Sequence, residues 1–222
     1  TKDLVFRPHF EKGIIIKGKV FHIKRDYKTE YTRLKSLEIN YKDTEKFISR
    51  CIKKKVIPMT TCFSRNRIQD LFDLGFEHIK VASYDCGSFH FLRALSKKFK
   101  NLIVSTGATY DSEISKANSI LKKAKIDYSF LHCVTLYPTP LNELHLSRIK
   151  YLQKFTSKIG FSDHSKTSSK NALVASKASI VFGAKIIERH VTILDKNQTR
   201  DGKVSIVPED IRRIKDFSKL SV

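Results

Sequence analysis

Two histidines stand in short polar sets that follow two apolar runs of the sequence. His164 lies in S-D-H-S after the run 158–161, and His190 lies in E-R-H at the end of the run 185–190. Apolar residues recur at helical spacing over 168–182, so this part of the chain predicts a strand, a helix and a second strand. Because the carboxyl ends of such parallel strands meet at one edge of a sheet, both histidines are expected to face a common cavity.

This histidine pair is open to two interpretations. Imidazole nitrogens bind divalent metals, so His164 and His190 could be the first two ligands of a metal, with water and an oxygen ligand completing the shell. The alternative is a pair of hydrogen-bonded structural histidines. The spacing alone leaves both interpretations open.

The other strand ends carry polar residues that suit an anion. The sets are T-T-C-F (60–63), K-V-A-S-Y-D (80–85), S-T-G (105–107) and F-S-D-H (161–164). Lys80 supplies a cation, and the turn around Gly107 lets backbone N–H groups approach an oxyanion. Hydroxyl donors come from Thr61, Ser83, Ser105 and Ser162. Together the sets predict a phosphate or carboxylate pocket, although any one of these serines could simply cap a helix.

Further candidates lie beside these sets. Asp85, five residues beyond Lys80, is placed to accept a proton or bind a water, or is an ordinary loop carboxylate. Asp163 and Asp201 are ambiguous, because S-D and D-G are common cap and turn sequences. Tyr137 precedes a proline and is therefore held rigidly, either as a wall of the pocket or as part of the core.

Predicted strands and helices alternate along the chain, which is typical of a parallel sheet covered by helices. Helices are expected from Glu38 to the lysine run 53–55, and over 64–74, 89–99, 111–123, 144–155, 168–182 and 209–220, whereas 11–36 reads as a long loop or a small excursion. The seven predicted strands are 4–6, 56–61, 78–82, 102–105, 129–133, 158–161 and 185–190. Seven is one fewer than a closed (β/α)₈ barrel needs. We therefore expect a single α/β domain over residues 1–222.

The composition is strongly basic, with 43 Lys and Arg against 22 Asp and Glu, a net charge of +21 over 222 residues. Nucleic acid is a common partner of such chains, but the lysines are spread over every predicted helix. A lysine-rich solvated surface is therefore favoured, with attraction of anionic substrates as the alternative and nucleic acid third. No apolar run reaches the roughly 18 residues that span a membrane.

The four cysteines, Cys51, Cys62, Cys86 and Cys133, show no C-x-x-C pairing. Reduced, mostly buried thiols in a cytoplasmic protein are expected. Cys133 lies in an apolar strand and is interpreted as a packing residue. The chain begins with Thr rather than Met, so a fragment or a processed product is one interpretation.

The motifs, in this order, resemble those of the sialic acid synthase family, which includes the N-acetylneuraminate, legionaminate and pseudaminate synthases. The matching stretches are T-T-C-F, K-V-A-S-x-D, I-V-S-T-G-A-T with D-S-E-I, L-H-C-V-T-L-Y-P-T-P, G-F-S-D-H-S, and G-A-K-I-I-E-R-H-V with a later D-G. The resemblance implies a TIM-type (β/α)₈ barrel that lacks its first strand here. It also implies condensation of phosphoenolpyruvate with an N-acetylated hexosamine, N-acetylmannosamine-like, to a nonulosonic acid plus phosphate. Mn²⁺ or Mg²⁺ would be the cofactor, and a homodimer is compatible with it.

The resemblance also implies roles for single residues. His164 and His190 fall on the metal ligands, and Asp85 falls where the family commonly has a catalytic Glu. Tyr137 falls near the acceptor sugar, and Asp201 where a carboxylate meets the sugar hydroxyls. The residues that fall on phosphoenolpyruvate contacts are Thr61, Lys80, Ser83, Ser105 and Ser162, around the turn at Gly107.

Several positions depart from the family pattern. The predicted strand 4–6 corresponds to the second barrel strand of the family. It reads V-F-R-P where the family has V-K-F-Q, so Phe6 stands in the place of a lysine that helps to hold phosphate. Asp85 is one methylene shorter than the family's Glu, and we expect no C-terminal antifreeze-like domain after Val222. These departures leave a second hypothesis open, a non-catalytic or truncated relative that acts as an anion- or sugar-binding domain.

Overall fold

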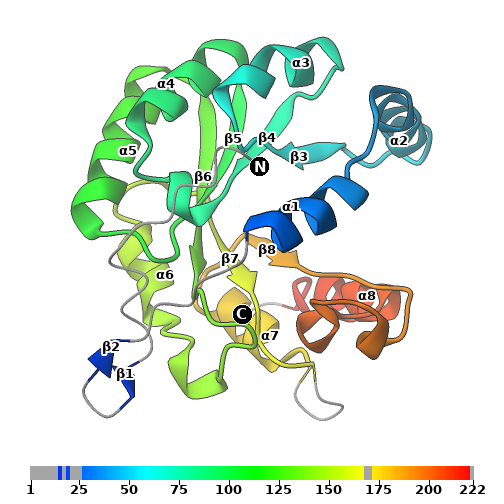
Figure 1. Cartoon of the computed structure of the whole chain (residues 1–222). Coiled ribbons are helices and arrows are strands. Elements are labelled where there is room, and N and C mark those ends of the chain that lie inside the picture. Colours follow the sequence, from blue (N-terminus) through cyan, green and yellow to red (C-terminus); the bar gives the residue numbers. More distant parts are fainter. Residues whose placement is uncertain (1–14, 17–18, 21–26, 168–171, 221–222) are drawn as a thin grey trace.

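The structure, a computed structural model, describes residues 15–16, 19–20, 27–167 and 172–220. Its centre is a sheet of six parallel strands in sequential order, curled into an open half-barrel (Figure 1). The strands are β3 (Met59–Thr61), β4 (His78–Val81), β5 (Asn101–Ser105), β6 (Asp127–Cys133), β7 (Ile159–Asp163) and β8 (Ile186–Arg189). Six of the seven predicted strands are thus confirmed, and the seventh, over 4–6 with Phe6, lies outside the described residues.

The sheet has two open edges. Within the described ranges, β3 pairs only with β4 and β8 pairs only with β7. A closed barrel has no such edges. The prediction of an incomplete TIM-type barrel is therefore confirmed.

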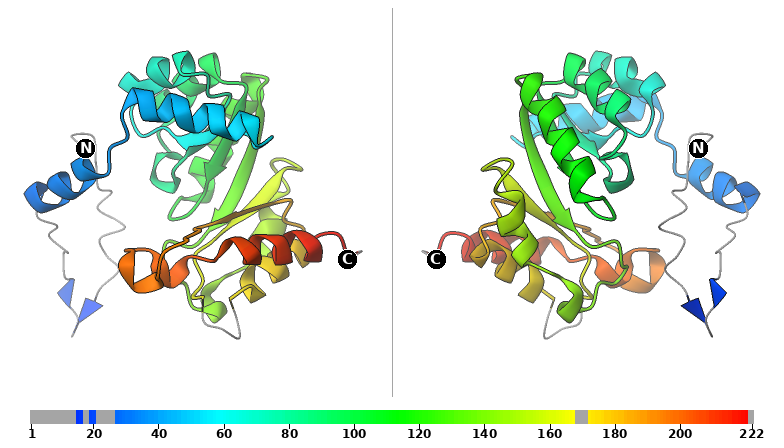
Figure 2. Two further views of the ribbon diagram at one scale, coloured as in Figure 1. Left: turned by 90° about the vertical axis from the view of Figure 1, so that its right-hand side faces the viewer. Right: turned by 90° about the vertical axis from the view of Figure 1, so that its left-hand side faces the viewer.

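Helices cover the outer side of the sheet. Figures 1 and 2 show α3 to α6 along the convex side, with α7 and α8 beside β7 and β8. The helices are α2 (Tyr41–Lys53), α3 (Ile68–Asp73), α4 (Phe89–Lys98), α5 (Asp111–Lys123), α6 (Ser147–Leu152), α7 (Val174–Val181) and α8 (Pro208–Phe217). Short 3₁₀ turns connect some of them, namely η2 (Arg65–Arg67), η3 (Ser83–Asp85), η4 (Leu141–Glu143), η5 (Lys196–Gln198) and η6 (Gly202–Val204). None of the helices that the structure describes is long and apolar enough to cross a membrane.

Local sequence signals explain several helix ends. Asn40 caps α2 by accepting a hydrogen bond from the backbone N–H of Asp43, and the predicted lysine run lies at the carboxyl end of this helix. Gly75, which follows α3, has a φ of 89°, a left-handed conformation that suits glycine at the end of a helix. Pro208 stands in the first turn of α8, where its missing N–H costs no hydrogen bond.

The interpretation of residues 11–36 as a loop was wrong in part. The segment contains α1 (Tyr27–Ser36) and a short antiparallel pair, β1 (Ile15–Ile16) with β2 (Lys19–Val20). The sequence of α1, YKTEYTRLKS, has only Tyr27, Tyr31 and Leu34 at helical spacing, an apolar stripe that is too narrow to indicate a helix clearly. Its last turn is basic, which suits a helix carboxyl end.

The predicted helix 144–155 is shorter in the structure. His145 adopts a φ of 47°, a left-handed conformation that a helix cannot contain, so α6 begins only at Ser147. The predicted helix 168–182 is described from Val174 onward, since 168–171 lie outside the described residues.

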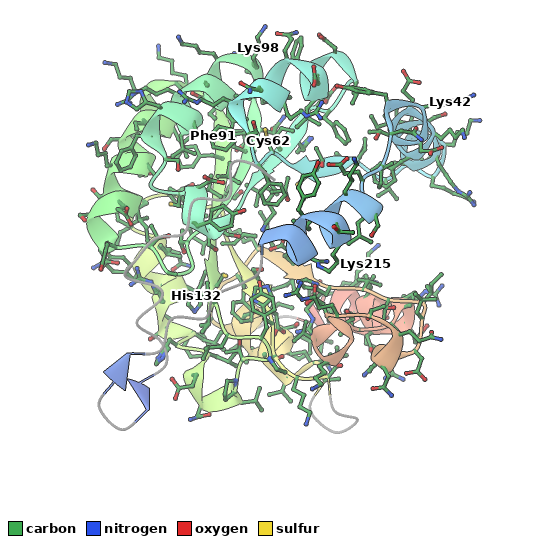
Figure 3. The ribbon with its side chains drawn as sticks, viewed as in Figure 1. Lys42, Cys62, Phe91, Lys98, His132 and Lys215 are labelled. Atoms are coloured by element: carbon green, nitrogen blue, oxygen red, sulfur yellow. The ribbon has the colours of Figure 1, made fainter. Side chains whose placement is uncertain are left out.

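The main core lies between the sheet and its helices. Outward-facing strand residues such as Ile79, Val104 and Phe161 are at most 1% exposed and belong to one apolar cluster with the helices. Charged side chains lie on the outer surface, as Lys98 at the margin of Figure 3 illustrates, while Cys62 lies inside. The inner face of the sheet is left for polar residues, which form the site described next.

Candidate active site

The ends of β7 and β8 determine which side chains enter the half-barrel. Phe161 and Asp163 point outward, and because strand side chains alternate, Ser162 and His164 point inward. The strand register pairs Ser162 with Glu188. Glu188 and His190 therefore also point inward, and the two predicted histidines meet with ring centroids 5.5 Å apart.

His164 is buried and held in one orientation. Its Nδ1 lies 3.2 Å from the carbonyl oxygen of Val134, and because a carbonyl only accepts, we assign the ring proton to Nδ1. Its Nε2 lies 2.9 Å from the hydroxyl of Tyr137 and 3.3 Å from that of Ser162. Burial, reinforced by the nearby His190, lowers the pKa of His164 from 6.5 to about 4. At neutral pH the ring is therefore uncharged, with the Nε2 lone pair facing the inner side.

Tyr137 and Asp201 complete this side of the half-barrel. The ring of Tyr137 stacks on His164 at 4.1 Å and meets His190 edge-on at 6.1 Å. Burial raises the pKa of Tyr137, so its hydroxyl stays protonated. Asp201 lies 3.7 Å from Nδ1 of His190. The structure thus brings Tyr137 and Asp201, predicted to meet the acceptor sugar, together with both histidines and with Ser162, which was predicted to contact phosphoenolpyruvate.

The donor set around His164 fits a divalent metal in part. A neutral imidazole whose second nitrogen is fixed by a carbonyl is the form in which histidine binds metals. However, no group of three or more His, Cys, Asp or Glu side chains in the described ranges is arranged to hold an ion. His164 and His190 would therefore supply only part of a coordination shell, with water and a bound ligand supplying the rest.

Glu188 belongs to the site but was not singled out from the sequence. Its Oε1 lies 3.0 Å from Nζ of Lys80, which reaches across from β4. Its Oε2 is buried and has no hydrogen-bond partner among the described residues. The signal was present in E-R-H, because a residue two positions before His190 on a strand must share its face.

The predicted anion-binding turn is built from three strand ends. The backbone N–H of Gly107 donates to Oγ of Ser83 at 3.1 Å, and Ser83 lies 3.4 Å from Sγ of Cys133. A Cβ on Gly107 would lie 2.7 Å from that sulfur, so only glycine permits this approach. Cys133 is buried as predicted, and burial raises the pKa of its thiol, but it also contacts the site.

The remaining predicted hydroxyls occupy different places. Ser105 is 1% exposed, and its Oγ has no hydrogen-bond partner within the described part of the chain. Ser162 contacts His164, as stated above. Thr61 ends the edge strand β3 and is the register partner of Lys80. The structure therefore places Thr61 beside the predicted cation, at the open edge of the sheet.

Asp85 shares a turn with Ser83 but directs its carboxylate towards α4. It sits in η3 after β4, and its Oδ1 accepts a hydrogen bond from Ser88, which precedes α4. It lines a cavity of about 540 Å³ with residues that include Arg65 and His90, and none of the other predicted site residues lines this cavity. Asp85 therefore lines a cavity that Lys80 and the two histidines do not line.

Comparison with known proteins places the chain in one protein family. A family model described as the NeuB family matches residues 12–220. The chain is 30% identical over 186 residues to N,N'-diacetyllegionaminic acid synthase of Campylobacter jejuni subsp. jejuni serotype O:2, covering 82% of this chain and 54% of that protein. It is 28% identical to pseudaminic acid synthase of Campylobacter jejuni serotype O:23/36, covering 97% of this chain and 61% of that protein. The chain spans about half the length of the curated relatives it matches.

Solved structures agree on the fold. The crystal structure of N-acetylneuraminic acid (sialic acid) synthetase from Leptospira borgpetersenii, in complex with citrate, superposes with a TM-score of 0.78 at 31% identity. The superposed region covers 87% of this chain and 67% of the synthetase chain. A truncated 3-deoxy-D-arabino-heptulosonate 7-phosphate synthase from Thermotoga maritima superposes with a TM-score of 0.67 at 16% identity, which shows a shared fold alone.

Proposed function

Because this chain belongs to the NeuB family, we propose that it forms the catalytic barrel of a nonulosonic acid synthase. C3 of phosphoenolpyruvate would attack the aldehyde carbon of an open-chain, N-acetylmannosamine-like hexosamine. Water would then add to C2, and the tetrahedral intermediate would release inorganic phosphate by cleavage of its C–O bond. One observation carries the proposal: a cation, a set of hydroxyl and amide groups, and two imidazoles converge at the strand ends.

Phosphoenolpyruvate would bind on the side of β4 and β5. Lys80 provides the cation, and its side chain is 15% exposed, so water screens its charge only in part. Ser83 and the backbone of Gly107 lie together at the adjoining turn. The unpaired hydroxyl of Ser105 is a further donor, which a bound anion would satisfy.

The acceptor sugar would bind on the side of β7 and β8. His164 and His190 would hold Mn²⁺ or Mg²⁺, which when bound supplies a Lewis acid for the aldehyde oxygen. Tyr137 offers a protonated hydroxyl beside His164, and Asp201 offers a carboxylate beside His190. These two groups suit the orientation of sugar hydroxyls by hydrogen bonds.

A carboxylate is needed to guide the water that adds to C2. The family resemblance assigns this role to Asp85, whereas the contact between Glu188 and Lys80 makes Glu188 a second candidate. Replacing each carboxylate by its amide separates the two assignments. The variant that loses phosphate release although it binds phosphoenolpyruvate at least as tightly as wild type identifies the carboxylate that guides water.

A second candidate is an anion- or sugar-binding domain without turnover. The two open sheet edges within the described ranges favour it, because a complete barrel would enclose the site on all sides. Phosphoenolpyruvate would still bind at Lys80 in this case. Only the release of phosphate distinguishes the two candidates.

The test is phosphate release from phosphoenolpyruvate with a panel of N-acetylhexosamines and Mn²⁺. The synthase proposal expects release that requires both the sugar and the metal, and that K80M abolishes. K98M, which removes an exposed lysine of α4, is the matched control. Binding without release supports the second candidate, and neither binding nor release from a folded chain overturns both.

A further inference from the structure

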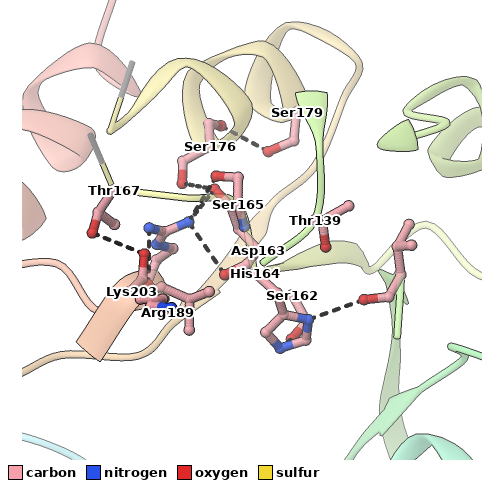
Figure 4. Close-up of polar contacts among 12 residues, drawn as sticks. Thr139, Ser162, Asp163, His164, Ser165, Thr167, Ser176, Ser179, Arg189 and Lys203 are labelled. Atoms are coloured by element: carbon pink, nitrogen blue, oxygen red, sulfur yellow. Dashed lines mark hydrogen bonds and ion pairs between the residues drawn. The ribbon is translucent and has the colours of Figure 1, made fainter. Parts of the chain in front are cut away.

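A buried ion pair between Asp163 and Arg189 lies next to His164 (Figure 4). Asp163 and Arg189 are register partners on β7 and β8, and each precedes one histidine in the sequence. Nη1 of Arg189 lies 2.6 Å from Oδ2 of Asp163, with side chains that are 3% and 0% exposed. Since side chains alternate along a strand, the pair points outward while the next residues, the histidines, point inward.

We propose that Asp163 and Arg189 are positioning residues that fix the mutual orientation of His164 and His190. This inference rests on the proposed function, because it concerns the same metal site. This ion pair, called the Asp163–Arg189 clamp below, joins the last residues of two strands. It determines the direction in which the chain leaves each strand. It therefore determines the separation and direction of the two imidazoles that follow.

Arg189 also connects the clamp to the segment that carries Asp201. Its Nη2 donates to the carbonyl oxygen of Val204 at 3.2 Å. Val204 in turn donates its backbone N–H to the carbonyl oxygen of Asp201 at 3.0 Å. One guanidinium thus links the backbones that present His164, His190 and Asp201.

Asp163 is held from the other side as well. Its Oδ1 accepts the backbone N–H of Ser165 at 2.8 Å, and its Oδ2 accepts the hydroxyl of Ser176 in α7 at 2.5 Å. Figure 4 shows these bonds converging on the carboxylate from the loop and from the helix. The carboxylate is therefore fixed to α7, and the clamp is fixed to the outer helix layer.

A contribution to folding stability does not by itself explain why this buried pair is charged. Burying two charges costs hydration, and apolar side chains of similar volume often stabilise a protein as well or better. Nε of Arg189 is in addition buried without a hydrogen-bond partner among the described residues. Orientation of the attached strands is what an ion pair supplies and an apolar pair does not.

The test replaces the ion pair by an apolar pair, D163L/R189M, in the full chain. The matched control is D127N/K158Q, which removes an exposed ion pair at the opposite ends of β6 and β7. Mn²⁺ affinity is measured from the free-ion EPR signal. The metal-free imidazole signals are recorded by ¹⁵N NMR and assigned with H164Q and H190Q.

The proposal expects D163L/R189M to fold, to lose Mn²⁺ affinity about ten-fold, and to shift the signals of His164 and His190, with the control unchanged. Affinity within two-fold of wild type, or unshifted imidazole signals, overturns it. If the wild-type chain binds no Mn²⁺, the proposed metal site fails. The imidazole signals of the metal-free chain then decide the positioning role by themselves.

A milder variant covers the case in which the double variant does not fold. R189K keeps a charge opposite Asp163 but loses the planar fork that reaches Val204. It is expected to shift the imidazole signals and to lower Mn²⁺ affinity by less than the double variant. Unshifted signals and unchanged affinity in folded R189K overturn the proposal.

Discussion

Replacing Glu188 by glutamine is expected to strengthen the binding of phosphoenolpyruvate to the metal-free chain. In the structure Glu188 contacts Nζ of Lys80 at 3.0 Å, so the carboxylate already neutralises the cation that the substrate must use. A phosphate on the far side of the same ammonium would be repelled by Glu188. The amide removes this repulsion while keeping the size of the side chain.

The size of the effect follows from the distance. With 3.0 Å on each side of the ammonium, the two anions would be about 6 Å apart, and Coulomb's law at an effective dielectric constant of about 20 gives a repulsion of about 3 kcal/mol. The two side chains are 15% and 29% exposed, so water screens part of this energy. A gain of about 1 kcal/mol, roughly five-fold in affinity, is therefore expected.

The assay is titration of the metal-free chain followed by the ³¹P signal of phosphoenolpyruvate. E143Q, which removes an equal charge from an exposed site, is the control for long-range effects. In the K80M background the gain is expected to disappear, because without Lys80 the phosphate is no longer held close to residue 188. An E188Q chain that is folded but binds phosphoenolpyruvate no better than wild type refutes the reasoning.

Three further predictions concern the same site. H164Q is expected to lower Mn²⁺ affinity at least ten-fold by EPR, whereas H145Q, at an exposed loop position, changes it less than two-fold; equal losses would contradict the assignment. The metal-free chain is expected to lose stability as the pH falls from 6.5 towards 4, because the unfolded His164 then binds more protons than the folded one, whose pKa is about 4. Urea unfolding at pH 7 and pH 5 is expected to show that the free energy of unfolding falls by up to about 1.4 kcal/mol per pH unit in wild type and by less in H164Q. An equal fall in both chains would refute the assignment. G107A is expected to lower the free energy of unfolding by about 1–3 kcal/mol through overpacking and to weaken phosphoenolpyruvate binding, both measured by calorimetry, with partial recovery in G107A/C133A because the sulfur lies 2.7 Å from the new Cβ. A G107A chain that binds phosphoenolpyruvate as tightly as wild type would show that the turn is not part of the pocket.

The strands and most helices could be predicted because their apolar residues follow a clear period. Helix α5 was predicted with its observed limits, 111–123, since acidic residues mark its first turn and lysines its last. Helix α1 was not found in this way, because its apolar stripe is limited to Tyr27, Tyr31 and Leu34. The start of α6 was missed because a left-handed residue, His145, gives no sequence signal unless it is glycine or asparagine.

The histidine pair of the site was predicted because each histidine directly follows a strand. Lys80 was found because it lies at the carboxyl end of a predicted strand, but its partner Glu188 was not, since their contact joins β4 to β8 across the curled sheet and depends on the curvature. The direction of the Asp85 side chain was also beyond the sequence. It depends on the 3₁₀ turn at 83–85, which directs its carboxylate to Ser88 at the start of α4.

The most direct test of the central claim is calorimetric titration of phosphoenolpyruvate into the purified chain, with Mn²⁺ and then after chelation. The account predicts a dissociation constant between micromolar and millimolar with Mn²⁺, weakened at least ten-fold by the chelator, because Lys80 and the paired histidines bind the ligand and its metal together. A chain that is folded by circular dichroism and binds phosphoenolpyruvate under neither condition would contradict it.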